Sequence, residues 1–143
     1  MQILIRQAAI KDVADLAVLT GQLGYEMSTV QTEESLKNIL AHKDHDVFVA
    51  LDNNKIIGWI GLFYSIQMES SPFCEIRGLV VDENYRGNGA GKMLIEKAKQ
   101  WAKERGLSKL RLRTNVKRTE THLFYQHLGF REMKQQKALE MDI

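Results

Sequence analysis

The sequence predicts an α/β (α+β) protein with a mixed, mostly antiparallel sheet of six or seven strands flanked by about four helices. Apolar segments of strand length recur between polar turns, which is typical of a sheet. Two of them are joined by Asp52-Asn53-Asn54, a hairpin turn that makes them antiparallel. A glycine-rich loop and a long helix connect the strands Cys74–Val81 and Leu107–Asn115, so these two strands are expected to be parallel neighbours. Because the chain holds one such strand–glycine–helix unit, a doubly wound sheet is not expected.

The N-terminal part is expected to contain one strand and two helices. Gln2–Gln7 has the pattern of a strand. A helix over Asp12–Leu23 follows, with Asp12 as its N-cap and Gly24 just past its end. Thr32 is expected to cap the second helix through a capping box. The inward-facing residues of that helix are Leu36, Ile39 and Leu40.

The remainder of the chain is expected to alternate strands and helices, each bounded by turn residues or a glycine. In chain order these elements are the strand Asp46–Leu51, the strand Lys55–Tyr64, a polar connection around Ser65–Pro72, the strand Cys74–Val81, a helix to about Glu104 stopped by Gly106, the strand Leu107–Asn115, a helix at Thr119–Leu128 closed by Gly129, and one or two strands within Phe130–Ile143.

The composition is that of a soluble globular protein, most simply one domain spanning residues 1–143 with a net charge of +2. No apolar run approaches the ~20 residues of a membrane helix, and the start, Met1–Arg6, is typical of a strand rather than a signal peptide. The single Cys74 rules out an internal disulfide and fits a reducing, cytoplasmic compartment. The basic cluster from Lys109 to Arg118 has no interleaved aromatic ladder, so neither nucleic acid nor membrane is an expected partner. No metal site is expected.

The run Val80–Gly91 is the most informative part of the sequence. An apolar strand end enters a loop with three glycines in five positions, and this loop opens an amphipathic helix. Glycines let successive backbone N–H groups point at one spot. The start of a helix adds unpaired N–H groups and the positive end of the helix dipole. The element therefore predicts an anion cradle suited to a pyrophosphate.

Two well-known phosphate-binding loops do not fit this run. A P-loop needs a Ser or Thr hydroxyl for magnesium after its Gly-Lys pair, and here Met93 follows Lys92. A dinucleotide-binding fold needs its glycines after the first strand and an acidic residue at the end of the next strand. Here the loop follows several strands, and the next strand ends in Thr114-Asn115.

The third interpretation is an acetyl-CoA loop. Arg86–Gly91 resembles the Arg/Gln-x-x-Gly-x-Gly/Ala signature of the GNAT family of N-acetyltransferases. Asn115 and the run His122–Phe130 resemble the second signature of that family, a strand-end Asn followed by Phe-Tyr-x-x-x-Gly-Phe. Leu23–Tyr25 is similar to the small bacterial branch, and Thr114–Tyr125 particularly resembles its aminoalkylphosphonate and aminoglycoside N-acetyltransferases. The resemblance covers nearly the whole chain in the order and spacing of the family.

This resemblance implies a single-domain acyl-CoA N-acyltransferase fold in which two central strands separate at their C-terminal ends around the cofactor. Backbone groups of Leu79 and Val81 would pair with the pantetheine amides, and the N–H of Leu79 would lie near the thioester carbonyl. The alternative for the glycines is a tight turn without a ligand. The residues that the resemblance assigns to acetyl-CoA binding are Leu79, Val80, Val81, Arg86, Gly87, Asn88, Gly89, Ala90, Gly91, Lys92, Asn115 and Tyr125.

Two residues are candidates for proton transfer. Tyr125 matches the family tyrosine that protonates the departing CoA thiolate, and a phenol pKa of about 10 suits a donor at neutral pH. Its alternative is an aromatic residue packed in the core. Glu75 is the leading candidate for the base, because strict alternation places it on one strand face with Arg77 and Leu79. Many relatives carry Glu where this chain has Arg77, so Glu75 acts through water or neutralises Arg77 instead.

The acceptor is expected to enter between the helix–helix connection and the Ser65–Pro72 segment. Carboxylates in this region favour a cationic amine, whereas Arg77 favours an acidic group. The candidate lining residues are Tyr25, Glu26, Trp59, Tyr64, Glu69 and Arg77.

The sequence therefore predicts an acetyl-CoA-dependent N-acetyltransferase that acts on a primary amine of a small molecule by direct attack through a tetrahedral intermediate. One alternative is a sensor that binds acyl-CoA on the same fold without turnover, and another is an N-acetyltransferase of proteins or peptides. Relatives are often dimers, so a homodimer is one expectation for the assembly.

Overall fold

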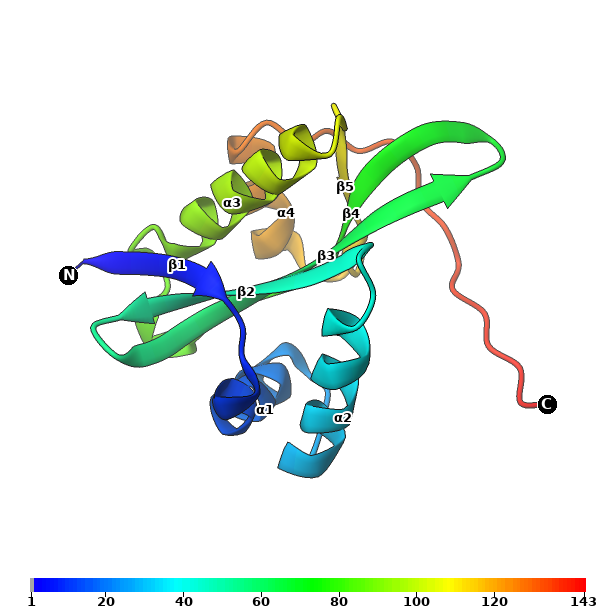
Figure 1. Cartoon of the computed structure of the whole chain (residues 1–143). Helices are drawn as coiled ribbons and strands as arrows, with labels where there is room; N and C mark the ends of the chain where they lie inside the picture. The colour runs from blue at the N-terminus through cyan, green and yellow to red at the C-terminus, as the bar shows by residue number, and fades with distance from the viewer. Residues whose placement is uncertain (1) are drawn as a thin grey trace. The chain divides into compact units, whose positions relative to one another are not determined.

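A five-stranded sheet organises the first part of the computed structural model, which describes residues 2–143 (Figure 1). Met1, the first residue of the predicted N-terminal strand run, lies outside the described residues. The chain forms two compact units, Met1–Arg113 and Thr114–Ile143. The elements of the first unit are β1 (Ile3–Gln7), the 3-10 turn η1 (Ile10–Asp12), α1 (Val13–Leu23), α2 (Thr29–Leu40), β2 (His45–Asp52), β3 (Lys55–Gln67), β4 (Ser70–Val81), the 3-10 turn η2 (Glu83–Tyr85), α3 (Ala90–Glu104) and β5 (Leu110–Leu112), and the helix of the second unit is α4 (Thr119–His127).

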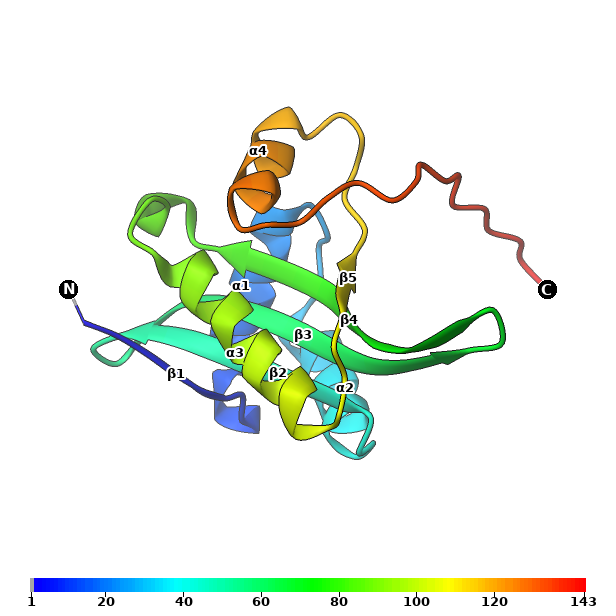
Figure 2. The same ribbon diagram turned by 90° about the horizontal axis from the view of Figure 1, so that it is seen from above.

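The sheet of the first unit confirms the predicted mixed topology. Its strands follow the order β1-β2-β3-β4-β5; the first three pairings are antiparallel and β4–β5 is parallel. Helix α3 is the crossover that makes the parallel pair possible. Figures 1 and 2 show α3 on one face of the sheet and α1 and α2 on the other. None of the described helices is both long and apolar enough to cross a bilayer.

Each face of the sheet buries an apolar layer under its helices. Leu94, Ile95 and Ala98 of α3 are fully buried, which requires an apolar stripe at helical spacing. On the other face, Leu16 and Leu19 of α1 and Leu36 of α2 pack with strand residues in one cluster. The strand residues of that cluster are Val47, Val49, Leu51, Ile56 and Val80. The sheet is therefore held rigidly from both sides.

The structure corrects the predicted start of α2. Helix α2 begins at Thr29, and Ser28 rather than Thr32 is its N-cap. The Ser28 Oγ accepts the N–H of Gln31 at 3.1 Å, and the Gln31 Oε1 accepts the N–H of Ser28 at 2.9 Å. This capping box lies four residues before the predicted one, because Ser28-x-x-Gln31 satisfies the same geometry earlier. The predicted inward residues Leu36, Ile39 and Leu40 are confirmed.

Three strand predictions also change. The predicted polar connection at Ser65–Pro72 is a β-hairpin in which Ser65 pairs with Phe73 and Gln67 with Ser70. Ladder hydrogen bonds suffice to form it, although its tip is exposed. Strand β5 is shorter than predicted, and Phe130–Ile143 contains no strand. The sheet of the described residues therefore has five strands rather than six or seven, since the run after Phe130 is rich in charged and amide side chains and lacks a continuous apolar face.

Asp12 is the N-cap residue of α1, as predicted, but its carboxylate makes no hydrogen bond to that helix and accepts one a turn earlier. The 3-10 turn Ile10–Asp12 precedes α1, and the Asp12 Oδ2 accepts the N–H of Ala9 at 2.8 Å. Both terminal nitrogens of Arg6 also donate to Asp12, at 2.7 and 2.9 Å. Asp12 is 3% exposed, so this bidentate pair is largely removed from water on the acidic side. The hydrogen bonds from Arg6 lower the pKa of the Asp12 carboxyl.

We expect Asp12→Asn to lower the free energy of unfolding by about 2 kcal/mol at pH 7, because it leaves the Arg6 guanidinium without its partner. The folded-state pKa of Asp12 lies below the unfolded value of about 3.9. Its contribution is therefore complete above that value and is lost as the pH falls through the folded-state pKa. Urea unfolding at pH 7 and pH 3 checks this, with the exposed Asp15→Asn as control. An equal difference between wild type and Asp12→Asn at both pH values contradicts the assignment.

Candidate functional site

Strand β4 continues beyond the point where its neighbour β5 ends. The parallel pairing runs from Cys74 opposite Leu110 to Ile76 opposite Leu112. On its other side, β4 stays paired with β3 as far as Val81. The outer edge of residues 77–81 therefore has no strand partner within the described part of the chain. Such an edge offers unpaired backbone groups to an extended ligand.

A β-bulge at Arg77 changes the faces that the sequence predicted. Leu62 pairs with Ile76, yet the next pair is Gly61 with Gly78, so Arg77 is an extra residue in β4. Paired residues share a face of the sheet. Glu75 and Gly78 therefore lie on the face covered by α1 and α2, whereas Leu79 lies on the α3 face. The expectation that Glu75 and Leu79 share a face is wrong, since one inserted residue reverses the alternation.

The bulge also decides which backbone groups of β4 point outward. Asp82 donates its N–H to the carbonyl of Ile57 at 2.7 Å, so Asp82 faces β3. In an antiparallel ladder, every second residue faces the partner strand and the residues between face away from it. The N–H and C=O groups of Leu79 and Val81 therefore point to the open edge. These are the two residues whose backbone the family resemblance selects.

The glycine-rich loop follows this edge after the single 3-10 turn η2, and its shape depends on left-handed backbone. Gly87 and Gly89 have φ of +83° and +88°, values that L side chains rarely adopt. A Cβ at either position meets no atom within 4 Å, so glycine is required by conformation and not by crowding. Together with Arg86 and Asn88, these residues are exposed.

The start of α3 completes a group of free donors. Met93 donates its N–H to the carbonyl of Gly89 at 3.0 Å, which makes Gly89 the N-cap. The N–H groups of Ala90, Gly91 and Lys92 precede this first helical bond and have no intrahelical acceptor. The dipole of the 15-residue helix adds partial positive charge at the same place. The arrangement fits a pyrophosphate, which is the anion that a cofactor of the CoA type would bring.

Two residues that sequence reasoning missed hold this loop in place. The Asp82 Oδ1 accepts the N–H of Asn84 at 2.9 Å, which caps η2. The Gln22 Oε1 in the last turn of α1 accepts the N–H of Glu83 at 2.9 Å. Asp-x-Asn after a strand is a recognisable Asx-turn signal, whereas nothing in the sequence connects Gln22 to a residue 61 positions away.

Glu75 and Arg77 form an ion pair on the face covered by α1 and α2. The Arg77 Nε lies 3.0 Å from the Glu75 Oε1, and the Glu75 side chain is 10% exposed. At about 3.3 Å per residue, Glu75 lies on the order of 13 Å along the strand from Leu79. A direct proton transfer from an amine at Leu79 to this carboxylate is therefore out of reach, and a relay through water is the route left to it.

The candidate acceptor residues do not all come together. Tyr25 and Glu26 are exposed in the connection after α1. Gln22, in the last turn of α1, accepts the N–H of Glu83. Trp59 packs on the core cluster with its ring over Gly78, where an added Cβ would lie 2.5 Å from the ring. Tyr64 pairs with Cys74 on the opposite face of the sheet from Trp59. Glu69 is in the hairpin turn before Ser70, on the order of 30 Å along β4 from Leu79.

The second unit holds Asn115 and Tyr125. The Asn115 Oδ1 accepts the N–H of Lys117 at 2.9 Å, and its carbonyl accepts the N–H of Arg118 at 3.0 Å. Asn115 thus shapes the entry to α4. The His122 Nε2 lies 2.8 Å from the same carbonyl.

Tyr125 packs edge-to-face against Phe124 and Phe130, with ring centroids 5.4 and 5.5 Å away. Burial raises the pKa of the Tyr125 phenol above its usual value. The phenol is therefore protonated throughout the neutral range. A general acid requires this state.

Cys74 has the wrong chemistry for an acyl-carrying nucleophile. It lies in β4 with 0% exposure, and burial raises the pKa of its thiol to about 11. The thiolate is the reactive form, so this sulfur is inert at neutral pH. A covalent acetyl-cysteine intermediate is therefore excluded by protonation and by access.

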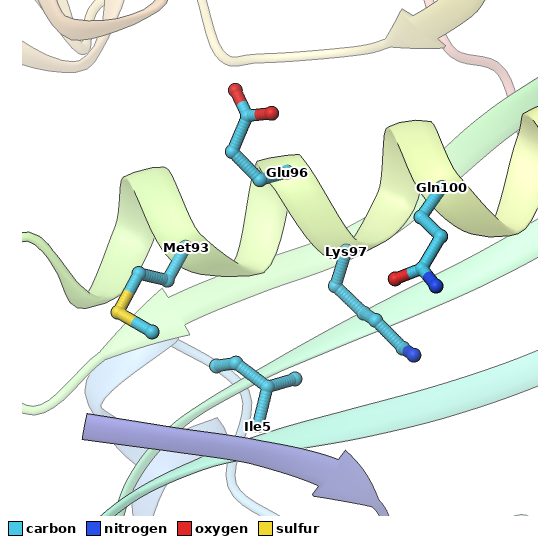
Figure 3. A pocket seen from close by; sticks show the side chains of 5 residues that line it. All are labelled: Ile5, Met93, Glu96, Lys97 and Gln100. Atoms are coloured by element: carbon cyan, nitrogen blue, oxygen red, sulfur yellow. The ribbon is translucent and has the colours of Figure 1, made fainter.

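A shallow hollow of about 300 Å³ lies between β1 and α3, away from the open edge of β4 (Figure 3). Figure 3 shows Met93 and Ile5 facing one another, whereas Glu96 points away from β1 and pairs with Lys99 at 2.9 Å. Lys97 is the cation among the described residues that line the hollow, and its ammonium lies 4.9 Å from the Phe48 ring centre. It lacks the outward backbone groups and free helix-start donors of the loop.

The comparisons agree with this geometry. The model of the acetyltransferase (GNAT) family matches residues 11–130. An uncharacterised N-acetyltransferase of Chlorobaculum tepidum is 28% identical over 133 residues, which cover 92% of this chain and 77% of that protein. The aminoalkylphosphonate N-acetyltransferase of Salmonella typhimurium is 32% identical over 85 residues, 59% of this chain and 55% of that protein. The structure of AAC(6')-Iy in complex with a bisubstrate analogue of CoA has a TM-score of 0.88 at 21% identity over the whole of both chains, which shows a shared fold.

Proposed function

The chain belongs to the acetyltransferase (GNAT) family, and from this premise we propose that it transfers an acetyl group from acetyl-CoA to a primary amine of a small molecule. The observation that carries the proposal is that the open edge of β4, the glycine-rich loop and the start of α3 follow one another directly along the chain. The outward backbone groups of Leu79 and Val81 lead within a few residues to the loop 86–91 and the free N–H groups of α3. An extended, amide-bearing chain that ends in a pyrophosphate matches this sequence of donors and acceptors.

The cofactor-binding residues follow from the two parts of the element. Leu79 and Val81 would line the extended arm through their outward backbone groups, and the Leu79 N–H would serve the thioester oxygen as it gains charge. Val80, which was expected to take part as well, has its backbone groups turned to β3. The pyrophosphate would be held by the backbone and side chains of Arg86, Gly87, Asn88, Gly89, Ala90, Gly91 and Lys92.

The reaction is a direct attack. Acetyl-CoA supplies an activated acyl carbon; the amine nitrogen forms the new C–N bond, and the C–S bond breaks with its electron pair on sulfur. The Tyr125 phenol donates its proton to that sulfur. The amine proton leaves through water, with Glu75 as the terminal base. The Arg77 Nε, 3.0 Å from the Glu75 Oε1, holds this carboxylate in place.

The acceptor is a small amine reached from the α1–α2 connection. Tyr25, Glu26, Trp59 and Arg77 are the candidate lining residues, whereas Tyr64 and Glu69 are less favourably placed. Relatives named as acetyltransferases of aminoalkylphosphonates and aminoglycosides support a small molecule as the acceptor class. A cytoplasmic location and a homodimer stay predictions.

One observation favours a second candidate, an acyl-CoA sensor without turnover. Arg77 stands where the family resemblance implies an acidic residue, and it forms an ion pair with Glu75. In that case the chain binds acetyl-CoA without releasing CoA.

The deciding experiment combines a titration with a turnover assay. We expect acetyl-CoA to bind in isothermal titration and free thiol to appear when a panel of primary amines is added. Binding without thiol release across the panel favours the sensor. Absence of acetyl-CoA binding overturns both candidates.

A glycine pair tests the loop. Gly87→Ala is expected to cost about 1–2 kcal/mol of stability through its positive φ and to weaken acetyl-CoA binding roughly tenfold or more, since the cradle can no longer form. Gly106 also has a positive φ, +73°, with nothing within 4 Å of an added Cβ. Gly106→Ala is therefore the matched control: it should lose similar stability and keep its affinity. Equal loss of affinity in both variants contradicts the cradle.

Tyr125→Phe tests the acid. We expect kcat to fall by about a hundredfold, with acetyl-CoA affinity largely unchanged, because one proton donor is removed without altering the ring. Because burial raises the pKa of Tyr125 above that of a free phenol, the wild-type enzyme should keep this donor protonated at neutral and mildly alkaline pH. Steady-state kinetics and titration measure both quantities, with Tyr85→Phe as control. Unchanged turnover removes Tyr125 as the acid.

A further inference from the structure

We propose that Arg77 and Arg111 bind an anionic group of the acceptor, so that the substrate is a small primary amine that also carries a phosphonate, phosphate or carboxylate. The proposal rests on the proposed acetyl transfer and adds the charge of the acceptor to it.

The bulge presents Arg77 as a partly free cation. Its side chain is 53% exposed, and only its Nε is engaged, by the Glu75 carboxylate. The guanidinium lies over the Phe63 ring, 4.5 Å from the ring centre, so its plane is held in place. Its two terminal nitrogens have no hydrogen-bond acceptor among the described residues. An arginine fixed by stacking and by one carboxylate is prepared to bind an oxyanion with the remaining donors.

Arg111 supplies a second arginine on the same face. It lies opposite Glu75 in the β4–β5 ladder, and paired residues share a face. Its guanidinium stacks on Phe73, 4.2 Å from the ring centre. The Arg111 Nε is buried and has no hydrogen-bond partner in the described chain. A buried donor without an acceptor is uncommon in folded proteins, and an anionic ligand is one acceptor that would satisfy it.

The charge balance around Glu75 leaves room for an anion. Glu75 lies on the same sheet face as the two arginines and makes an ion pair with one of them, Arg77. His45 stacks on Phe63, the ring that also lies under Arg77. Burial and the nearby Arg77 lower the pKa of His45, so it adds no charge at neutral pH. Asp44 is the carboxylate that acts on His45, and His42 lies against the same ring. One positive charge in the Glu75–Arg77–Arg111 group is therefore uncompensated.

The position of Arg77 matches the size of a small acceptor. Arg77 is two residues before Leu79, roughly 7 Å along the strand. Leu79 is where the proposed mechanism places the thioester carbonyl. A small molecule that carries an amine and an oxyanion covers this distance together with the length of the arginine side chain, whereas a polycation such as an aminoglycoside would meet the arginines with like charge. The structure therefore favours an anionic amine over a polycationic one.

Selectivity between matched amines tests the proposal. The acceptors are 2-aminoethylphosphonate, β-alanine and, without an anion, propylamine. We expect kcat/KM of the wild type to be higher for the two anionic amines. The ratio of anionic to neutral acceptor should fall at least about tenfold in Arg77→Gln and in Arg111→Gln, which corresponds to the loss of one charge-assisted hydrogen bond. Lys103→Gln, which removes an exposed cation at the end of α3, is the control and should keep the wild-type ratio.

A binding measurement separates this proposal from the proposed function. Ethylphosphonate, which has no amine, should bind to the CoA-loaded wild type in isothermal titration and bind at least tenfold more weakly to Arg77→Gln. Ethylphosphonate binding without turnover of any amine overturns the acetyl transfer and keeps the anion site. An unchanged selectivity ratio in both arginine variants, or wild-type preference for propylamine, overturns the anion site. Arg77→Lys, which keeps the charge but loses the planar fork, covers the case in which Arg77→Gln does not fold.

Discussion

The hydrogen bonding of β4 is the constraint on which the rest of the site depends. One edge of this strand is paired with β3 along its length, while the other is paired with β5 only as far as Ile76. The inserted residue Arg77 falls at the point where the second pairing stops. Because a bulge reverses the alternation of everything that follows, it turns Leu79 and Val81 outward with their backbone and leaves Glu75 on the opposite face. The end of β4 is thus hydrogen-bonded to a neighbouring strand on one side only.

The remaining parts of the first unit keep that edge open and aligned with the loop. Helices on both faces bury the apolar sides of the sheet, so β4 cannot twist away from β3 without exposing them. Asp82 and Gln22 fix the turn between the strand and the glycines by accepting backbone N–H groups. The glycine-rich loop is therefore held in place by its connections to α1 and β4. Its glycines allow the left-handed backbone conformation, and the neighbouring Asp82 and Gln22 fix where the loop lies.

Much of this arrangement could be predicted from the sequence. Gly87 and Gly89 indicated a loop of convergent backbone N–H groups before a helix, and the crossover through α3 indicated the parallel pair. The bulge at Arg77 could not be predicted, because a single inserted residue leaves no mark in a strand of mixed apolar and charged residues. The bulge moves Leu79 to the opposite face of the sheet from Glu75, whereas strict alternation predicted the same face for both. The capping of α2 was predicted one turn late, since Thr32 and Ser28 both fit a capping sequence and only packing chooses between them.

The burial of Cys74 has a practical consequence for enzymology. The chain has a single cysteine, and its sulfur is enclosed in β4 and protonated up to about pH 11. In the folded protein it neither reduces a disulfide dye nor crosslinks two molecules during storage. Any thiol that a colorimetric reagent detects over the native enzyme at neutral pH therefore comes from coenzyme A. The folded protein therefore adds no thiol signal to a CoA-release assay, and a thiol signal that rises without acetyl-CoA would indicate unfolding.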